Sequence, residues 1–150
     1  MNVISPPHDG PGFEREFSGL SFADVPKRLR RHRAHNLHKA IRRVRRYQCF
    51  LGWNPRRPKT ELAQSLFRRV VSSLPNGKKE LRLFLAIGTC LDLMGVDFFF
   101  EYRGRIVTVD LTTSQYKKDY RADILLTRWH FLANEHYLIG SEIASRLLSR

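Results

Sequence analysis

Two aspartates in strongly apolar surroundings, Asp97 and Asp110, are the residues of this sequence best placed to do chemistry. They belong to the stretch VDFFFEYRGRIVTVDLTT at 96–113, which is typical of a β-hairpin turning at Arg103-Gly104. A two-residue loop places Asp97 directly opposite Asp110, where like charges destabilise a sheet. A cation would offset this repulsion, and hard carboxylate oxygens suit Mg²⁺ or Mn²⁺. Two alternatives stay open: solvated or loop-capping aspartates at a strand end, and a three-residue loop that separates the pair onto opposite faces.

The side chains of this hairpin divide between the two faces of a sheet. Alternation puts Phe98, Phe100, Tyr102, Val107, Val109 and Leu111 on one face, which is suited to burial. Both aspartates and Thr112 belong to the other face. We therefore expect Thr112 to stand beside Asp110 and any cation held there.

Apolar periodicity predicts the elements that position the hairpin. Helices are expected from the N-cap Asp24 to about Tyr47, over Glu61–Leu74 after the N-cap Thr60, and over about 134–148. Strands are expected at 79–87, 97–102, 105–112 and 122–127. The chain is thus predicted to consist of a flexible tail at 1–20, a basic helical arm and linker at 21–59, and an α/β core at 60–150.

The positive charge of the chain is concentrated in one segment. The net charge is +13, and residues 25–60 contain thirteen lysines and arginines but no acid, so the remainder is neutral. Such a run is the electrostatic pattern expected for binding a nucleic-acid backbone, with an anionic membrane or a merely solvated face as alternatives. Tyr47 and Trp53 could stack on bases, although Trp53 could equally anchor the linker. The candidate contacts to the backbone are Lys27, Arg28, Arg30, Arg31, Arg33, Lys39, Arg42, Arg43, Arg45, Arg46, Arg56 and Arg57.

Composition narrows the class of protein further. Two cysteines without CxxC spacing give neither a disulfide framework nor a zinc motif, and they favour a reducing, cytoplasmic setting. No apolar run is long enough for a membrane span, and no signal peptide is evident, so a soluble protein is expected. Charge alone allows DNA or RNA as the partner, and a homodimer or larger complex is also allowed. His32, His35 and His38 recur every third residue, but no acid or cysteine accompanies them, and we interpret them as part of the polar helix face.

The order of these features resembles the core of the PD-(D/E)XK, or restriction-endonuclease-like, nuclease superfamily. The likeness covers about 60–130 and consists of a helix with Glu61, a strand, GVD at 95–97, the hairpin, VDLTT at 109–113 and ADILLT at 122–127. It implies a helix, three strands, a helix and a strand, forming a mixed sheet flanked by helices. It also implies a metal-dependent endonuclease acting on DNA, with Asp97, Asp110 and Glu61 holding Mg²⁺. Glu80 is the alternate for Glu61, and Asp92 is either a further ligand or a turn residue.

One position departs from the pattern of that family. Thr112 stands where the family has a lysine, and a hydroxyl brings no positive charge to the transition state. Lys117 or Lys118, just beyond the strand, would have to supply it. The alternative is a protein that keeps the nuclease fold and binds nucleic acid, or acts as a scaffold, without catalysis.

Overall fold

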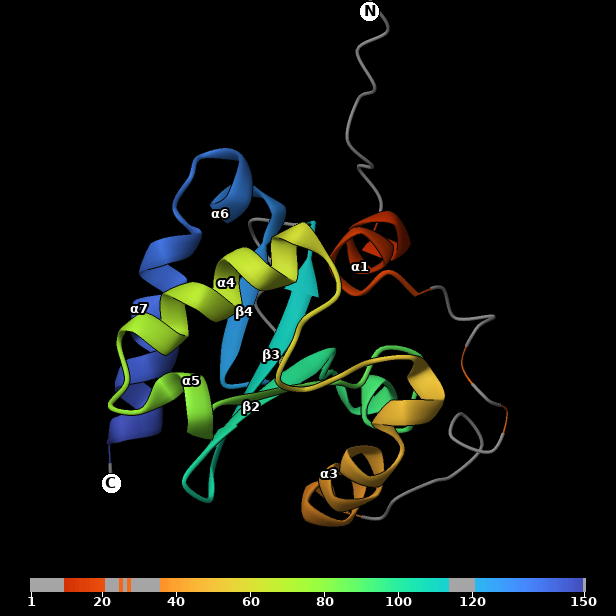
Figure 1. The fold of residues 1–150 in the computed structure, drawn as a ribbon. Helices are drawn as coiled ribbons and strands as arrows, with labels where there is room; N and C mark the ends of the chain where they lie inside the picture. Colours follow the sequence, from red (N-terminus) through yellow and green to blue (C-terminus); the bar gives the residue numbers. More distant parts are fainter. Residues whose placement is uncertain (1–9, 21–24, 26, 28–35, 114–120, 150) are drawn as a thin grey trace, which may run out of the picture.

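A computed structural model of the chain describes residues 10–20, 25, 27, 36–113 and 121–149. Along these residues, helices precede and follow a run of four strands (Figure 1). The helices are α1 (Gly10–Ser18), α3 (Leu37–Arg46), α4 (Glu61–Ser72), α5 (Gly77–Glu80), α6 (Arg128–Leu132) and α7 (His136–Leu148), with short 3₁₀ turns η2 (Gln48–Leu51) and η3 (Asp92–Met94). The strands are β1 (Arg82–Leu85), β2 (Phe98–Tyr102), β3 (Arg105–Thr112) and β4 (Ile124–Thr127). None of these helices is long and apolar enough to cross a membrane.

The four strands form one mixed sheet in the order β1-β2-β3-β4. The first three are antiparallel neighbours, whereas β4 lies parallel to β3. The carboxyl ends of β1, β3 and β4 therefore meet at one end of the sheet, together with the beginning of β2. The expectation of an α/β protein with a mixed sheet flanked by helices is confirmed.

The hairpin has the predicted two-residue loop. Tyr102 pairs with Arg105 and Phe98 with Val109, as that loop requires. Arg103 and Gly104 both have left-handed backbone, with φ of 50° and 78°, which is the conformation of a type I′ turn. This turn matches the twist of the strands and fixes which side chains share a face.

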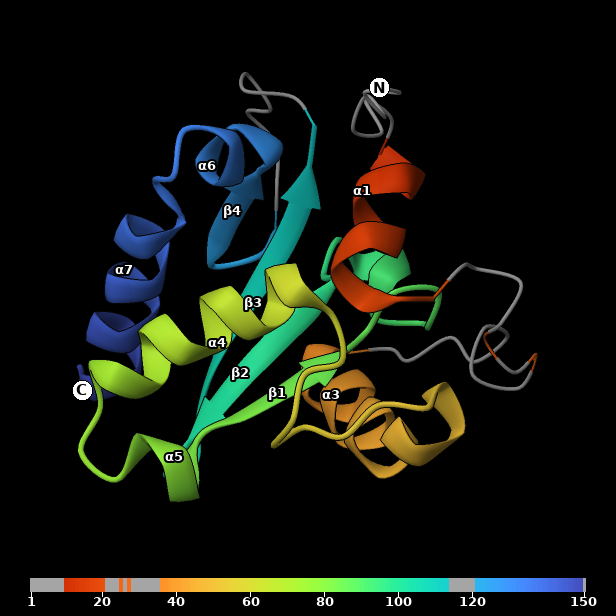
Figure 2. The same ribbon diagram turned by 45° about the horizontal axis from the view of Figure 1, so that its top comes forward.

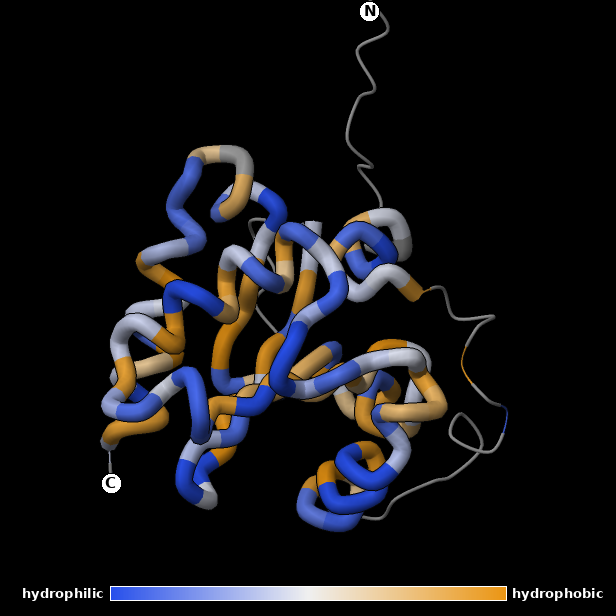
Figure 3. Tube along the Cα trace, in the orientation of Figure 1, coloured by the Kyte–Doolittle hydropathy of each residue, from blue (hydrophilic) through white to orange (hydrophobic). Residues whose placement is uncertain are grey.

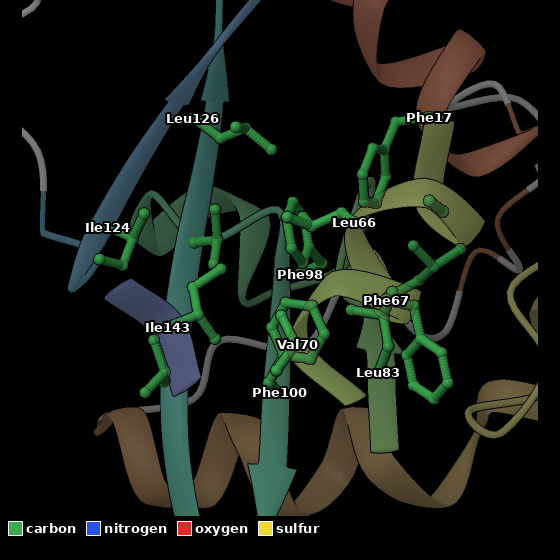
Figure 4. Close-up of a cluster of buried hydrophobic side chains, with 14 of the residues drawn as sticks. Phe17, Leu66, Phe67, Val70, Leu83, Phe98, Phe100, Ile124, Leu126 and Ile143 are labelled. Carbon is green, nitrogen blue, oxygen red and sulfur yellow. The ribbon is translucent and has the colours of Figure 1, made fainter. Parts of the chain in front are cut away.

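Both faces of the sheet are covered by helices. Phe98, Phe100, Val107 and Val109 belong to a large apolar cluster with α1, α4 and α7 (Figure 4). Phe99, on the opposite face, belongs to a smaller cluster with α3 and the η3 loop. The predicted division of the hairpin into two faces is confirmed, and the second face is buried as well.

The open edge of β1 is closed by the segment that follows α3. Gln48 pairs with Leu85 in both directions: its Nε2 donates to the Leu85 carbonyl and its Oε1 accepts from the Leu85 N–H, both at 2.8 Å. At Leu83, the carbonyl accepts from Trp53 Nε1 (2.8 Å) and the N–H donates to the carbonyl of Pro55 (2.9 Å). Unpaired edge groups invite association with other strands, and this segment satisfies them. Part of the predicted arm and linker is thus docked on the sheet.

Residues 10–18 do not form the flexible tail predicted for 1–20. They form α1, whose Phe13 and Phe17 are fully buried, and the Phe17 ring stacks on Phe98 with 4.5 Å between centroids. Glu16 pairs with Arg128 at 2.6 Å and ties α1 to α6. The prediction was wrong because the buried side of this short helix consists of only two large apolar residues, four positions apart. Two residues are too few to form a recognisable periodic pattern in the sequence.

The helix predicted from Asp24 to Tyr47 is not continuous. Its described helical part, α3, begins after Asn36, which has extended backbone and whose side chain accepts from the Lys39 N–H at 2.9 Å. Asparagine at this position stabilises a helix start, so Asn36 ends any preceding helix. Asp24 and residues 28–35 lie outside the described residues.

The remaining elements follow the sequence pattern with shifted ends. Thr60 caps α4 by accepting from the Ala63 N–H, as predicted. The strand expected at 79–87 is confined to β1, because residues 77–80 form α5. β4 and α7 fall within the ranges predicted for them, whereas the short α6 was not predicted.

Candidate functional site

Asp97 immediately precedes β2, which lies between β1 and β3 in the sheet. Its N–H donates to the Val109 carbonyl (2.9 Å), and its carbonyl accepts from the Ala86 N–H (2.8 Å). Its Oδ2 accepts from the Leu111 N–H at 2.7 Å. The Asp97 carboxyl group thus accepts the hydrogen bond that a backbone carbonyl of a longer β2 would accept from β3. Its side chain is buried, and the residue is only 2% exposed. A buried backbone donor is satisfied in this way, and a carboxyl group is fixed at the end of the sheet.

Three carboxyl groups from separate elements converge at this end of the sheet. Asp97 is joined by Asp92 of η3 and Glu14 of α1, with one ligand atom of each lying within 4.8 Å of the others. Asp92 Oδ2 also accepts from the Gly88 N–H at 2.7 Å, which fixes its orientation. Two views show α1 and the η3 loop near the same end of β2 (Figures 1 and 2). We call Glu14, Asp92 and Asp97 the acid group.

The surroundings of Asp97 favour its neutral form. Burial, followed by the negative charge of Asp92, a hydrogen bond with Asp92 and the charge of Glu14, raises the pKa of Asp97 to about 10. The hydrogen bond from Leu111 acts in the opposite direction but is outweighed. Asp97 therefore holds a proton at neutral pH when no cation compensates the charge.

The donor set of the acid group fits a hard divalent cation. Three carboxylates offer only oxygen, which Mg²⁺ and Mn²⁺ prefer. Asp92 and Glu14 are half-buried, so solvent can complete the coordination. A cation would replace the proton on Asp97, and its binding would strengthen with pH.

The acid group differs from the metal ligands that the sequence predicted. Asp97 and the alternate Asp92 lie within it, but Asp110 and Glu61 do not. The paired residues of the hairpin end at Phe98 and Val109, so the expected Asp97–Asp110 pair does not continue the ladder. Asp110 is buried in β3, at 5% exposure, whereas Glu61 is exposed in the first turn of α4.

Glu80 is far from the acid group along the sheet. It pairs with Arg103 of the hairpin turn at 2.8 Å, because α5 leads into the opposite end of β1. Glu80 is therefore not a member of the acid group, and its role as an alternate metal ligand stays a prediction. Glu14 was missed because it lies in the segment predicted as a tail; the flanking Phe13 and Phe17 were the available signal for a packed helix.

The structure describes Thr112 but not the two lysines that were predicted to replace the missing lysine. Thr112 is the last residue of β3 and pairs with Thr127 of β4. Lys117 and Lys118 lie outside the described residues. The role assigned to them stays a prediction.

The basic segment forms a defined surface on α3. Ala40, Ile41 and Val44 are buried against the sheet, which turns the opposite side of the helix outward (Figure 3). The outward side chains line a depression of about 300 Å³, which we call the cationic depression; they are Lys39, Arg42, Arg43, Arg46 and Tyr47. Three of its four cations are exposed, with Arg43 half-buried. These cations are thus carried by a helix that is packed against the sheet.

Other predicted contacts have different positions. Arg45 turns toward the sheet, where it pairs with Glu101 at 3.2 Å and lies over the Phe84 ring. Trp53 is 4% exposed and anchors the chain to β1, so it does not stack on bases. Arg56 and Arg57 are exposed in the segment between η2 and α4, and Lys27, which precedes α3, is exposed as well. The other predicted contacts lie outside the described residues; they are Arg28, Arg30, Arg31 and Arg33.

A serine and a histidine form a further polar contact that the sequence did not indicate. Ser65 Oγ and His136 Nε2 lie 2.7 Å apart between α4 and α7. Nδ1 of His136 is buried without a hydrogen-bond partner among the described residues, and burial lowers the pKa of this histidine. A nucleophilic triad needs an acid at that nitrogen to orient the ring. The pair is a polar bridge between two helices.

No family model, curated protein or solved structure matches this chain. The resemblance to the nuclease superfamily stays a prediction.

Proposed function

We propose that this protein binds nucleic acid through the cationic depression and hydrolyses phosphodiester bonds with Mg²⁺ or Mn²⁺ held by the acid group. The observation that carries the proposal is the convergence of Glu14, Asp92 and Asp97 from three elements. Burying like charges together is costly unless a proton or a cation compensates them. A site that serves only the fold would need no second and third carboxyl group around Asp97.

The residues of the acid group would have distinct roles in this reaction. Asp97 is the fixed ligand, because its backbone and its Oδ2 are both bound to β3. Asp92 and Glu14 face solvent more openly and would complete the site while leaving room for water and a phosphate oxygen. A bound cation would lower the pKa of a coordinated water and stabilise charge developing on the phosphate.

The cationic depression would supply affinity for the backbone. Lys39, Arg42 and Arg46 are exposed, and no acid interrupts residues 25–60. Contacts of this kind neutralise phosphates and release counterions, so binding should weaken steeply with salt. DNA is the substrate implied by the family resemblance, while charge supports RNA equally.

A second candidate is binding without hydrolysis. The hydrogen bond from Leu111 to Asp97 gives the buried carboxyl group a structural task of its own. In addition, Thr112 replaces the family lysine. A scaffold or binding protein that kept the fold would retain Asp97 for this reason.

Cleavage assays on single variants separate the two candidates. Supercoiled plasmid, single-stranded DNA and RNA are incubated with Mg²⁺ or Mn²⁺, and Asp92→Asn and Glu14→Gln are compared with Glu61→Gln, an exposed acid outside the acid group. Loss of a ligand should reduce cleavage by at least about tenfold, and Glu61→Gln should leave it unchanged. Equal cleavage by Asp92→Asn would refute this site. If no substrate is cut but all are bound, the second candidate holds.

A further inference from the structure

We infer that the surface of α3 and η2 takes single-stranded nucleic acid, with Phe50 as the platform on which an unpaired base stacks. This inference rests on the binding half of the proposed function, and it specifies the substrate class. It does not depend on the acid group.

Phe50 is an exposed aromatic residue beside Tyr47, one of the residues that line the cationic depression. Its side chain belongs to η2 and is 52% exposed. Its ring centroid lies 5.7 Å from that of Tyr47, which lines the depression beside the cations. A single exposed phenylalanine is common on protein surfaces. What points to a nucleic-acid base is the contact of Phe50 with Tyr47, which lines the depression together with four cations, in a segment without acids.

The platform is held in place by the rest of η2. Gln48 is 4% exposed and bonds the Leu85 backbone twice, and Leu51 is buried in the large cluster. Phe50 lies between these two anchors and therefore has a fixed backbone. A base that stacks on it would find an ordered partner, so less conformational entropy is lost on binding.

The cations of the depression form a row along α3. Lys39, Arg42, Arg43 and Arg46 recur at intervals of three and four residues along one side of α3, a length of about 10 Å. Proteins that bind single strands combine such a charged track with aromatic platforms. In a duplex the base faces are stacked inside, where a surface phenylalanine cannot reach them. The combination of ring and track therefore favours an unpaired strand.

Fluorescence anisotropy with labelled oligonucleotides tests the inference. The probes are single-stranded DNA and RNA of about 12 nucleotides and a DNA duplex of two fully complementary strands, all in EDTA so that none is cleaved. Phe50→Ala is compared with Phe50→Trp and with Trp129→Ala, which removes an aromatic ring of similar exposure (51%) on α6. We expect Phe50→Ala to weaken single-strand binding by about fivefold or more, with the duplex changed by less than about twofold. Phe50→Trp should retain the affinity, and Trp129→Ala should match the unmodified protein.

Failure of the inference and failure of the proposed function would look different. Unchanged single-strand affinity in Phe50→Ala, or a duplex bound as tightly as the single strand, would overturn the inference. The double variant Arg42→Gln/Arg46→Gln tests the binding surface itself, with Lys78→Gln on α5 as the charge control. If the double variant binds every probe normally, the cationic depression is not the nucleic-acid surface, and the proposed binding fails with it. Comparison of the two single strands shows whether a 2′-hydroxyl matters.

Discussion

The helices α1 and α3 contribute to opposite faces of the sheet and use their charged residues in opposite ways. α1 buries two phenylalanines and directs Glu14 to the acid group. α3 buries only small or medium aliphatic residues, and it exposes its cations. Charge on α1 is thus built into the end of the sheet, whereas charge on α3 is displayed on the surface. Changes on the α1 side should therefore affect stability first, and changes on the outer side of α3 should affect binding first.

The largest expected effect comes from removing the ring that docks α1. Phe17→Ala should lower the free energy of unfolding by about 3–5 kcal/mol, because the ring is fully buried against Phe98. Ile41→Val, on the buried side of α3, should cost only about 0.5–1.5 kcal/mol. Chemical denaturation measures both, with the exposed Leu93→Ala as the control. A loss below about 1 kcal/mol for Phe17→Ala would contradict the packing of α1 as part of the core.

The acid group should make stability depend on pH. The folded pKa of Asp97, about 10, lies above its ordinary value of 3.8, so the folded protein binds this proton more tightly than the unfolded chain. The stability that this proton contributes is complete below about pH 4 and is lost as the pH rises toward 10. Asp97→Asn keeps an acceptor for the Leu111 N–H without a titrating group. At pH 8 without divalent cations, we expect it to be more stable than the unmodified protein by several kcal/mol, because the difference grows by up to about 1.4 kcal/mol for each pH unit above about 4.

Thermal unfolding between pH 5 and 9, with and without Mn²⁺, checks this prediction. The curve for Asp97→Asn should be flatter, and Mn²⁺ should raise the unfolding temperature of the unmodified protein more than that of the variant. Glu61→Gln, outside the acid group, serves as the control. Parallel pH curves for the protein and for Asp97→Asn would show that Asp97 does not titrate as described.

The sequence predicted most of the sheet, but it did not predict the segments that pack around the sheet. The Arg103-Gly104 turn and the alternation around it predicted the register and both faces of the hairpin. These features are local, and a period of two residues leaves few alternatives. The elements that depend on distant contacts were missed: α1 is marked by two phenylalanines only, and the docking of Gln48 on Leu85 joins residues far apart in the chain.

The candidate site was predicted in part for the same physical reason. Asp97 was selected because an acidic residue in an apolar stretch is conspicuous, and the structure shows that its side chain is buried. Its companions depend on how the chain is placed around the end of the sheet. The prediction assumed that the pairing of β2 with β3 continues to Asp97 and Asp110. The pairing ends one residue earlier, at Phe98 and Val109, and the carboxyl group near Asp97 is Glu14 of α1. No local pattern relates Glu14 to Asp97, since their proximity arises only from tertiary packing.

The smallest expected effect distinguishes two neighbouring arginines of α3. Arg45 pairs with Glu101, whose side chain is 17% exposed, and Arg46 lines the cationic depression. Arg45→Gln should lower the free energy of unfolding by up to about 1 kcal/mol, the usual range for a partly exposed ion pair, and it should leave the salt dependence of nucleic-acid binding unchanged. Arg46→Gln should leave stability unchanged and reduce the slope of log affinity against log salt by about 0.7. Denaturation and salt titrations on both variants measure the four values. The same change in slope for both arginines would mean that the helix acts through its total charge, and the contrast between its inner and outer sides would not hold.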